Sequence, residues 1–248
     1  MAEEISGGLA RNRVRVEVQG QNMNLQPGNI ISFTLPEGLL HMPSLKIHMD
    51  ALTTRSGNLF AKLPADATSL ISRVEIFANG ASLNAGCSQY NTVARIKKLM
   101  ESSIDRDHST ERMLSHSQML VDAAVDDETL VLHDLVGGFL GREASVHYVD
   151  TSLIGPLTIR FTLESSNVLT VVQTGVTFPN ALTDASATPT YSVSNVYASV
   201  DVVQLPDVYQ QLVRERISQV GYISILYRDF YTFESPGQTA NSLSLIHI

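Results

Sequence analysis

The chain has 248 residues, of which 44% are hydrophobic and 17% are charged, and it contains no tryptophan. A chain of this length can bury a sizeable core without disulfides or metals, and its composition is neither that of a disordered protein nor that of a fibrous one. The formal net charge of -8 argues against direct nucleic-acid binding, because proteins that hold phosphates normally carry a basic face.

The single cysteine, Cys87, excludes an intrachain disulfide and fits a reducing compartment. Its sequence neighbours supply no base that would activate a thiol, so we interpret it as a small buried residue. The acidic start, Met1 to Glu4, lacks the basic and apolar regions of a signal peptide, and no apolar run approaches the ~20 residues of a membrane helix. We therefore expect a soluble protein that is made inside the cell and has no transmembrane segment.

Alternation of apolar and polar residues with a period of two is the strongest local signal, and it predicts strands with one face in a core. In chain order, it occurs in the ranges 14–18, 31–35, 45–49, 74–76 and 157–163. Pro36 ends the second run, and Pro43 precedes the third. Short strands separated by turn signals are typical of antiparallel sandwiches and barrels.

Two positions refine this pattern. Asn79-Gly80 favours the type I′ turn of a hairpin, because both residues tolerate positive φ angles. In the range 191–203 the apolar residues change parity partway. We expect a bulge or bend near Asn195, because one extra residue exchanges the buried face of a strand.

A first helix is predicted over 89–101, where apolar residues recur at helical spacing. The residues at that spacing are Val93, Ile96 and Met100, with Lys97 and Glu101 expected outside. The densest basic cluster of the chain, Arg95, Lys97 and Lys98, is then interpreted as the solvated side of this helix.

A second helix is predicted over 206–219, where a proline suits the first turn and apolar residues follow four apart. It comes after the last clear strand and before another strand-like run, 222–233, so we interpret it as a connector between two modules. The acidic range 102–128 and the range 174–189 are interpreted as long loops, which carry specific contacts in sandwiches.

The histidines do not match a metal site. On a continuous helix, His108 and His116 would lie about 12 Å apart, too far for one metal ion. The remaining histidines are scattered among strands and lack the paired spacing of a cupin metal site: His41, His48, His133 and His147.

Other motifs that bind cofactors or ions are incomplete. The glycine-rich run 137–141 lacks the lysine and the following helix of a phosphate loop. The acidic run Asp126-Asp127-Glu128 lacks the alternating oxygen ligands of a calcium loop and is interpreted as a solvated charged turn. We therefore predict no catalytic, cofactor or metal residues, and no enzyme activity.

Three stretches follow one another in a recognisable order. They are 70–80 running into Gln89-Tyr90-Asn91, then 138–141 followed by 155–163, then 191–207 with a helix and the range 223–233 after it. With these motifs, most of the range 12–233 resembles the N-terminal part of double jelly-roll major capsid proteins of tailless double-stranded DNA viruses, in the polinton and virophage-like group. The motifs are loose patterns without a catalytic signature.

The resemblance implies an all-β fold, an antiparallel eight-stranded jelly-roll β-sandwich with one or two short helices and the start of a second roll. It implies a structural virion protein whose homotrimers form the pseudo-hexagonal capsomers of an icosahedral shell, with minor capsid proteins as further partners. Such a protein is made in the cytoplasm or nucleus of the host cell and resides in the virion.

The resemblance also sets the expected domain boundaries, because a full double roll needs about twice this length. We expect a flexible N-terminal arm (1–11), a first jelly roll (12–203), a connector helix (204–219) and the first-strand region of a truncated second roll (220–242). The last residues, 243–248, read like a translated sequencing adapter, and we expect them to be non-native.

Two other classes stay open on the sequence. A single jelly-roll binding module, or a minor capsid or spike protein, is one alternative, although carbohydrate-binding modules often use tryptophan to stack on sugars. An enzyme on a cupin-like roll is the other, and the histidine spacing disfavours it.

Overall fold

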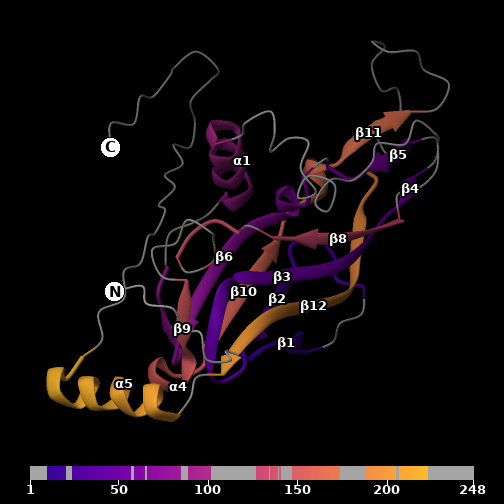
Figure 1. Ribbon diagram of the computed structural model, residues 1–248. Helices are drawn as coiled ribbons and strands as arrows, with labels where there is room; N and C mark the ends of the chain where they lie inside the picture. Colours follow the sequence, from indigo (N-terminus) through magenta and orange to yellow (C-terminus); the bar gives the residue numbers. More distant parts are fainter. Residues whose placement is uncertain are drawn as a thin grey trace, which may run out of the picture.

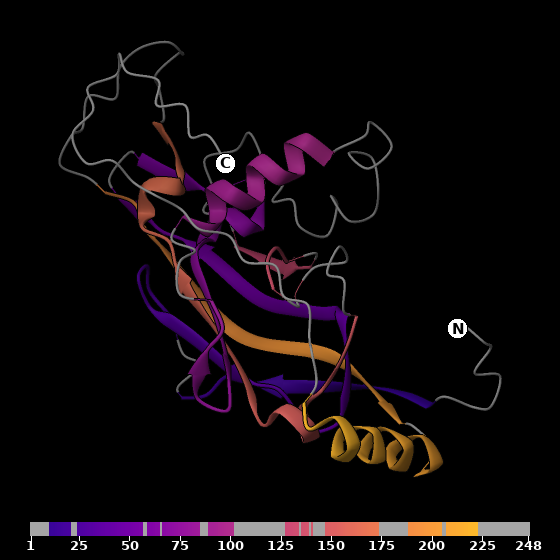
Figure 2. The same ribbon diagram turned by 90° about the vertical axis from the view of Figure 1, so that its left-hand side faces the viewer.

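The computed structural model describes residues 10–20, 24–56, 59–64, 66–84, 89–101, 127–133, 135–138, 140, 147–173, 188–204 and 207–222. Within these residues the chain forms a sandwich of antiparallel strands with a helix near each end (Figure 1). A view turned by 90° shows the same placement of the two helices (Figure 2). Several expectations fall outside the described residues: those for Cys87, His108, His116 and most of 102–128, 174–189 and 222–233.

The strands that precede the first long helix are β1 (Ala10–Glu17), β2 (Ile30–Thr34), β3 (Leu39–Thr53), β4 (Arg55–Ser56), β5 (Leu59–Lys62), β6 (Ile71–Ala78) and β7 (Ala81–Ser82). The later strands are β8 (Asp127–Leu132), β9 (Tyr148–Asp150), β10 (Leu157–Leu163), β11 (Thr170–Gln173) and β12 (Tyr191–Gln204). The helices are α1 (Tyr90–Glu101), α4 (Thr151–Ile154) and α5 (Asp207–Val220), with single 3-10 turns at η1 (Ala67–Leu70) and η2 (Ser166–Val168). No described helix is both long and apolar enough to span a membrane.

Two main sheets carry the architecture. Sheet A has the strand order β1-β12-β3-β8, with β9 also paired to β3, and sheet B has the order β2-β10-β6-β7. All of these pairs are antiparallel. If the eight strands of the two main paths are numbered along the chain, the sheets read 1-8-3-6 and 2-7-4-5, which is the order of a jelly roll. The predicted antiparallel jelly-roll sandwich is therefore confirmed, with β4, β5, β9 and β11 as additional short strands.

The core lies between the inner faces of the two sheets. In β10, alternate residues from Leu157 to Leu163 are buried and the residues between them are not, as the sequence pattern predicts. Phe33 of β2 meets Phe161 of β10 edge to face, with ring centroids 6.2 Å apart. Burial of these apolar faces is the main stabilising contribution to the sandwich.

The two local predictions are confirmed. Asn79 and Gly80 both have positive φ, 47° and 80°, and join β6 to β7 as a type I′ hairpin. Asn195 has a φ of 49°, and the pairing of β12 with β3 shifts register between Ser194 and Tyr197. Two residues of β12 thus lie opposite one residue of β3, which is a β-bulge.

Three boundary or face predictions need correction. The strand expected after Pro43 runs from Leu39 straight through the proline, because the β3–β12 ladder is interrupted there and needs no N–H from that residue. Asp127 and Glu128 begin β8 and do not form a charged turn, since they pair with Leu52 and Ala51 of β3.

The third correction concerns the buried face of α1. Tyr90 and Ala94 are buried, whereas Ile96 is 49% exposed. The helix docks against η1 and β6, and the Tyr90 hydroxyl accepts a hydrogen bond from the backbone N–H of Val136 at 2.7 Å. The predicted inward position is therefore wrong for Ile96, because the docking surface lies on the side of Tyr90 and Ala94. Arg95 is exposed, as predicted.

Asn84 extends the pairing of β6 beyond the short strand β7. Its buried side chain accepts from the backbone N–H of Ile76 at 2.6 Å and donates to the carbonyl of Val74 at 3.0 Å. A side-chain amide thus substitutes for the backbone of a neighbouring strand.

We predict that Asn84→Ala lowers the free energy of unfolding by about 2–4 kcal/mol, because it leaves two buried backbone groups of β6 unpaired. Urea unfolding measures the difference. Asn12→Ala, at an exposed position of β1, is the control and should change it by less than about 0.5 kcal/mol. Equal losses in both variants would contradict this role of Asn84.

Candidate interaction surface

The described histidines do not converge on one site. His41 and His48 point outward from β3, seven residues apart, which is more than about 20 Å along an extended strand. His133 follows β8, and His147 precedes β9. Among the described residues, no three His, Cys, Asp or Glu side chains are placed to hold a metal ion together. The absence of catalytic and cofactor residues stays a prediction.

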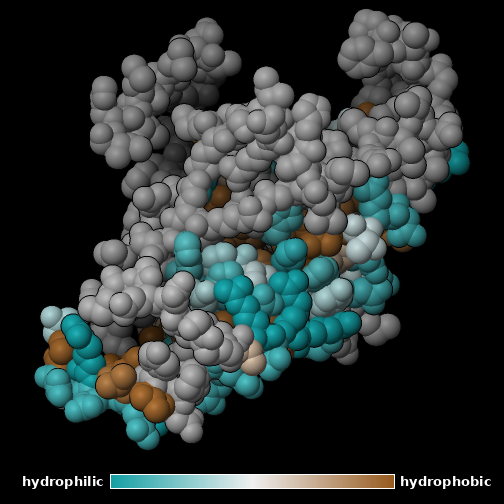
Figure 3. All heavy atoms as spheres, in the orientation of Figure 1, coloured by the Kyte–Doolittle hydropathy of each residue, from teal (hydrophilic) through white to brown (hydrophobic). Residues whose placement is uncertain are grey.

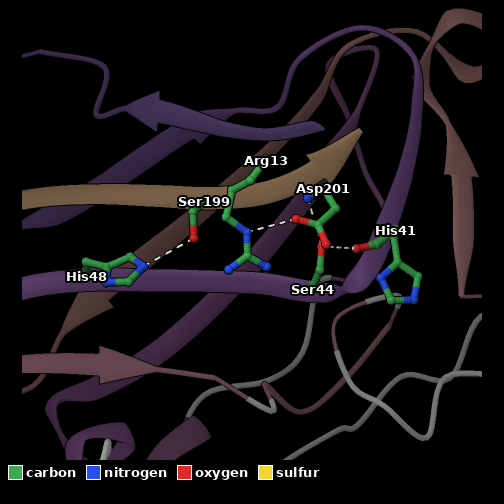
Figure 4. A network of polar contacts seen from close by, with 6 residues as sticks. All are labelled: Arg13, His41, Ser44, His48, Ser199 and Asp201. Atoms are coloured by element: carbon green, nitrogen blue, oxygen red, sulfur yellow. Dashed lines mark hydrogen bonds and ion pairs between the residues drawn. The ribbon is translucent and has the colours of Figure 1, made fainter. Parts of the chain in front are cut away.

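A network of polar contacts lies on one side of sheet A. We call the side chains of β1, β12, β3 and β9 that point away from the core the outer face of sheet A. Its principal members are Arg11, Arg13, Arg15, His41, Lys46, His48, Tyr148, Tyr197, Ser199 and Asp201. Figure 4 shows part of this network across β1, β12 and β3.

A large irregular bulge in β3 lies in the middle of this face. Four residues of β3, from Met42 to Leu45, lie opposite the single Val200 of β12. The buried Ser44 hydroxyl bridges the gap: it donates to the carbonyl of His41 at 2.6 Å and accepts from the backbone N–H of Asp201 at 2.8 Å (Figure 4). One serine side chain thus replaces the ladder bonds that the bulge removes.

The arginines of β1 reach across the outer face. The Arg11 guanidinium donates to the Tyr148 hydroxyl at 2.9 Å, and Arg13 Nε lies 2.8 Å from a carboxylate oxygen of Asp201. The Arg15 guanidinium lies over the Tyr197 ring, 3.9 Å from its centroid, which is a cation–π contact.

Each of these tyrosines also contacts a histidine of β3. His48 stacks on Tyr197 with ring centroids 4.5 Å apart and an interplanar angle of 8°, and its Nε2 lies 3.2 Å from the Ser199 hydroxyl. His41 packs on Tyr148 at 5.0 Å. The arrangement of arginine, tyrosine and histidine therefore occurs twice on the outer face.

The surroundings of both histidines favour the neutral form of the ring. Burial lowers the pKa of His48 below its ordinary value, and the nearby cations Lys46, Arg13 and Arg15 lower it further. Burial also lowers the pKa of His41; Arg11 and His147 act in the same direction, and Asp201 opposes them. Basic side chains of β1 thus create a local positive field in a chain that is acidic as a whole.

The sequence predicts β1, β12 and the second half of β3 on this face, but neither β9 nor the contacts between the strands. The alternation of Arg13 and Arg15 with valines predicts β1, yet their partners Asp201 and Tyr197 follow more than 180 residues later. No local signal could have identified these partners. The parity change near Asn195 was the one available clue, because it determines which residues of β12 point outward.

Helix α5 presents a second surface of a different kind. Apolar side chains project from it into solvent: Val208 is 65% exposed, Leu212 is 55% exposed and Val213 is 42% exposed. Hydrophobic side chains gather visibly on this helix, whereas much of the coloured surface beside it is hydrophilic (Figure 3). In both ribbon views α5 lies outside the sheets, at the end of the sandwich where β12 ends.

Comparison with known proteins agrees with the strand order. Protein VP54 of the virus PBCV-1, fitted into a cryo-EM reconstruction of the virophage Sputnik, superposes on 88% of this chain with a TM-score of 0.52 and 18% sequence identity. The chain has the fold of a jelly-roll capsid protein. It spans only 47% of the VP54 chain, about half of its length.

Two further solved structures are similar to this chain, although their scores are too low to add to the argument. A chain of the PBCV-1 virus capsid has 16% identity and a TM-score of 0.48, covering 85% of this chain and 46% of its own length. The major capsid protein P2 of bacteriophage PM2 has 14% identity and a TM-score of 0.32, covering 78% and 52%. No family model matches the sequence. No curated protein matches it either.

We predict that Ser44→Ala destabilises the fold by about 1–3 kcal/mol, because the Asp201 N–H and the His41 carbonyl lose their shared partner in a buried setting. Chemical unfolding followed by circular dichroism measures the loss. Ser194→Ala, on the same strand as Asp201, serves as the matched control. A change of less than about 0.5 kcal/mol in Ser44→Ala would show that the bulge does not need this bridge.

Proposed function

We propose that this chain is the N-terminal half of a major capsid subunit with two jelly rolls, which forms trimeric capsomers of an icosahedral virus shell. The observation that supports the proposal is the half-length match: the superposed region covers 88% of this chain but 47% of the VP54 chain. A subunit of that size has room for a second body comparable to the first. In this proposal the protein is structural and not an enzyme, and it resides in the virion with minor capsid proteins as neighbours.

The exposure of α5 supports the same organisation. An isolated helix of fourteen residues is marginal in water, and most helices are stabilised by packing of an apolar face. Within the described residues, the apolar side chains Val208, Leu212 and Val213 have little cover. A second roll that followed the connector would bury them.

The proposed domain boundaries follow from this reading. The first roll comprises 12–203, the connector 204–219 and the beginning of the second roll 220–242, with 243–248 as a non-native tail. The expected N-terminal arm, 1–11, overlaps β1 at Ala10 and Arg11, which pair with Gln204 and Val203.

We predict that the longer protein encoded by an uninterrupted reading frame contains a second roll of similar size and runs as a trimer. Sequencing beyond codon 242 tests the first part, and size-exclusion chromatography with light scattering tests the second. A stop codon at that point in an intact genome, together with a stable monomer at high concentration, would refute the proposal. That result would favour a single-roll binding module or a minor capsid or spike protein.

A double substitution on α5, Val208→Gln with Leu212→Gln, tests whether a second roll buries the apolar side chains of this helix. In the 248-residue chain it should change the free energy of unfolding by less than about 0.5 kcal/mol, because both side chains are exposed. In the longer protein it should cost about 2 kcal/mol or more, since burial of a Val or Leu contributes about 1.5–3 kcal/mol. Gln211→Ala, an exposed polar position of the same helix, is the control, and equal effects in both lengths of chain would contradict a covered α5.

A further inference from the structure

Among the strands that the structure describes, β1 pairs with a single neighbouring strand, β12. Within the described residues β1 is therefore an edge strand of sheet A. Its inward-facing side chains, Val14 and Val16, are only half-buried. Its backbone ladder with β12 runs from Ala10 to Glu17. Outside that ladder, β1 is held by packing of Val16 against the core and by the three arginine contacts of the outer face, to Tyr148, Asp201 and Tyr197.

Two of the three arginine contacts depend on tyrosines that histidines also hold. β12 lies between β1 and β3, so Tyr197 has Arg15 approaching from β1 and His48 stacked from β3. Tyr148 of β9 likewise receives the hydrogen bond of Arg11 and packs on His41. Protonation of either histidine would therefore place a positive charge close to the arginine that contacts the same tyrosine.

Few groups near His48 are free to compensate a positive charge on its ring. Lys46 on its own strand and Arg13 and Arg15 on β1 are cationic, while Tyr197 and Ser199 on β12 are neutral. The carboxylate of Glu17 on β1, opposite Tyr197, is already paired with Arg15 at 2.6 Å, and that of Asp201 is paired with Arg13. On β8, the residue paired with His48 is Val131. The carboxylate of Asp50, two residues along β3, already accepts hydrogen bonds from Thr129 and Asn195.

The surroundings of His41 are similar. Arg11 on β1 and His147 before β9 oppose a charge there, and Asp201 on β12 favours one. That carboxylate is already paired with Arg13. His41 Nδ1 is buried and has no hydrogen-bond partner among the described residues, so a proton on it would add an unsatisfied donor.

We propose that β1 is an acid-releasable strand: protonation of His41 and His48 places two cations beside Arg11 and Arg15, and this repulsion detaches β1 from β12. The proposal does not depend on the number of rolls or on trimer formation. Detachment would bare the backbone edge of β12, and an open sheet edge is a template for pairing with another strand.

The direction of the pH effect follows from the lowered pKa values of the two histidines. Both rings are neutral in the folded protein at pH values where they begin to gain protons in the free chain, near the ordinary pKa of 6.5. Their contribution to the attachment of β1 is therefore complete above that value and is lost as the pH falls below it.

Hydrogen–deuterium exchange of the 248-residue chain tests the proposal, with protection factors corrected for the intrinsic rate at each pH. Measurements at about pH 7.5 and about pH 5 lie on either side of the ordinary histidine pKa. We expect the protection of β1 amides to fall severalfold at the lower pH, while that of β6 and β10 amides stays unchanged. The double variant His41→Asn with His48→Gln should keep its β1 protection at both pH values.

His133→Gln, which removes a histidine outside the network, is the matched control and should behave like the unchanged chain. If the double variant loses protection in sheet B at pH 7.5, the two single variants replace it, and each should remove part of the acid effect. The proposal is overturned if β1 protection does not fall at the lower pH, if it falls equally in the histidine variants, or if β6 and β10 open together with β1.

Discussion

The irregular pairing of β12 with β3 is the constraint on which the outer face of the molecule depends. Side chains of a regular strand alternate between faces, so fourteen residues of β12 would keep one parity throughout. The bulge at Asn195 breaks that parity, and Val193 and Val196 are therefore both buried. The same shift turns Tyr197 and Asp201 outward, where the arginines of β1 reach them.

β1 is consequently held by two different kinds of interaction. On the inner side, half-buried valines contribute a modest hydrophobic term. On the outer side, guanidinium groups contact a tyrosine hydroxyl, a tyrosine ring and a carboxylate. The outer contacts lie near the surface, where each ion pair contributes little to the stability of the fold. The pKa values of the histidines depend on the charges nearby and not on the net charge of the chain. Although the chain carries a net charge of -8, His41 and His48 lie among cations.

The two ends of the sandwich differ in how complete their packing is. At one end α1 docks through Tyr90 and Ala94, and the Tyr90 hydroxyl fixes the backbone at Val136. At the other end β12 leads into α5, whose apolar residues Val208 and Leu212 face solvent. The exposed apolar helix and the match to about half of the VP54 chain are the two observations behind the proposed two-roll subunit.

The sequence by itself determined β1, β2, β6, β10, β12 and the second half of β3, together with the hairpin at Asn79-Gly80, the bulge near Asn195 and both long helices. Alternation, turn chemistry and helical spacing act between near neighbours, so a local pattern suffices for these elements. It did not determine which side of α1 is buried, because Val93 lies on the face of Tyr90 and also on the face of Ile96. Docking against η1 and β6 buries the face of Tyr90 and leaves Ile96 exposed. The outer face of sheet A was decided by the tertiary structure alone. Arg11 and Tyr148 are 137 residues apart, and Arg13 and Asp201 are 188 apart; contacts over such separations depend on strand order and register, which local patterns do not encode.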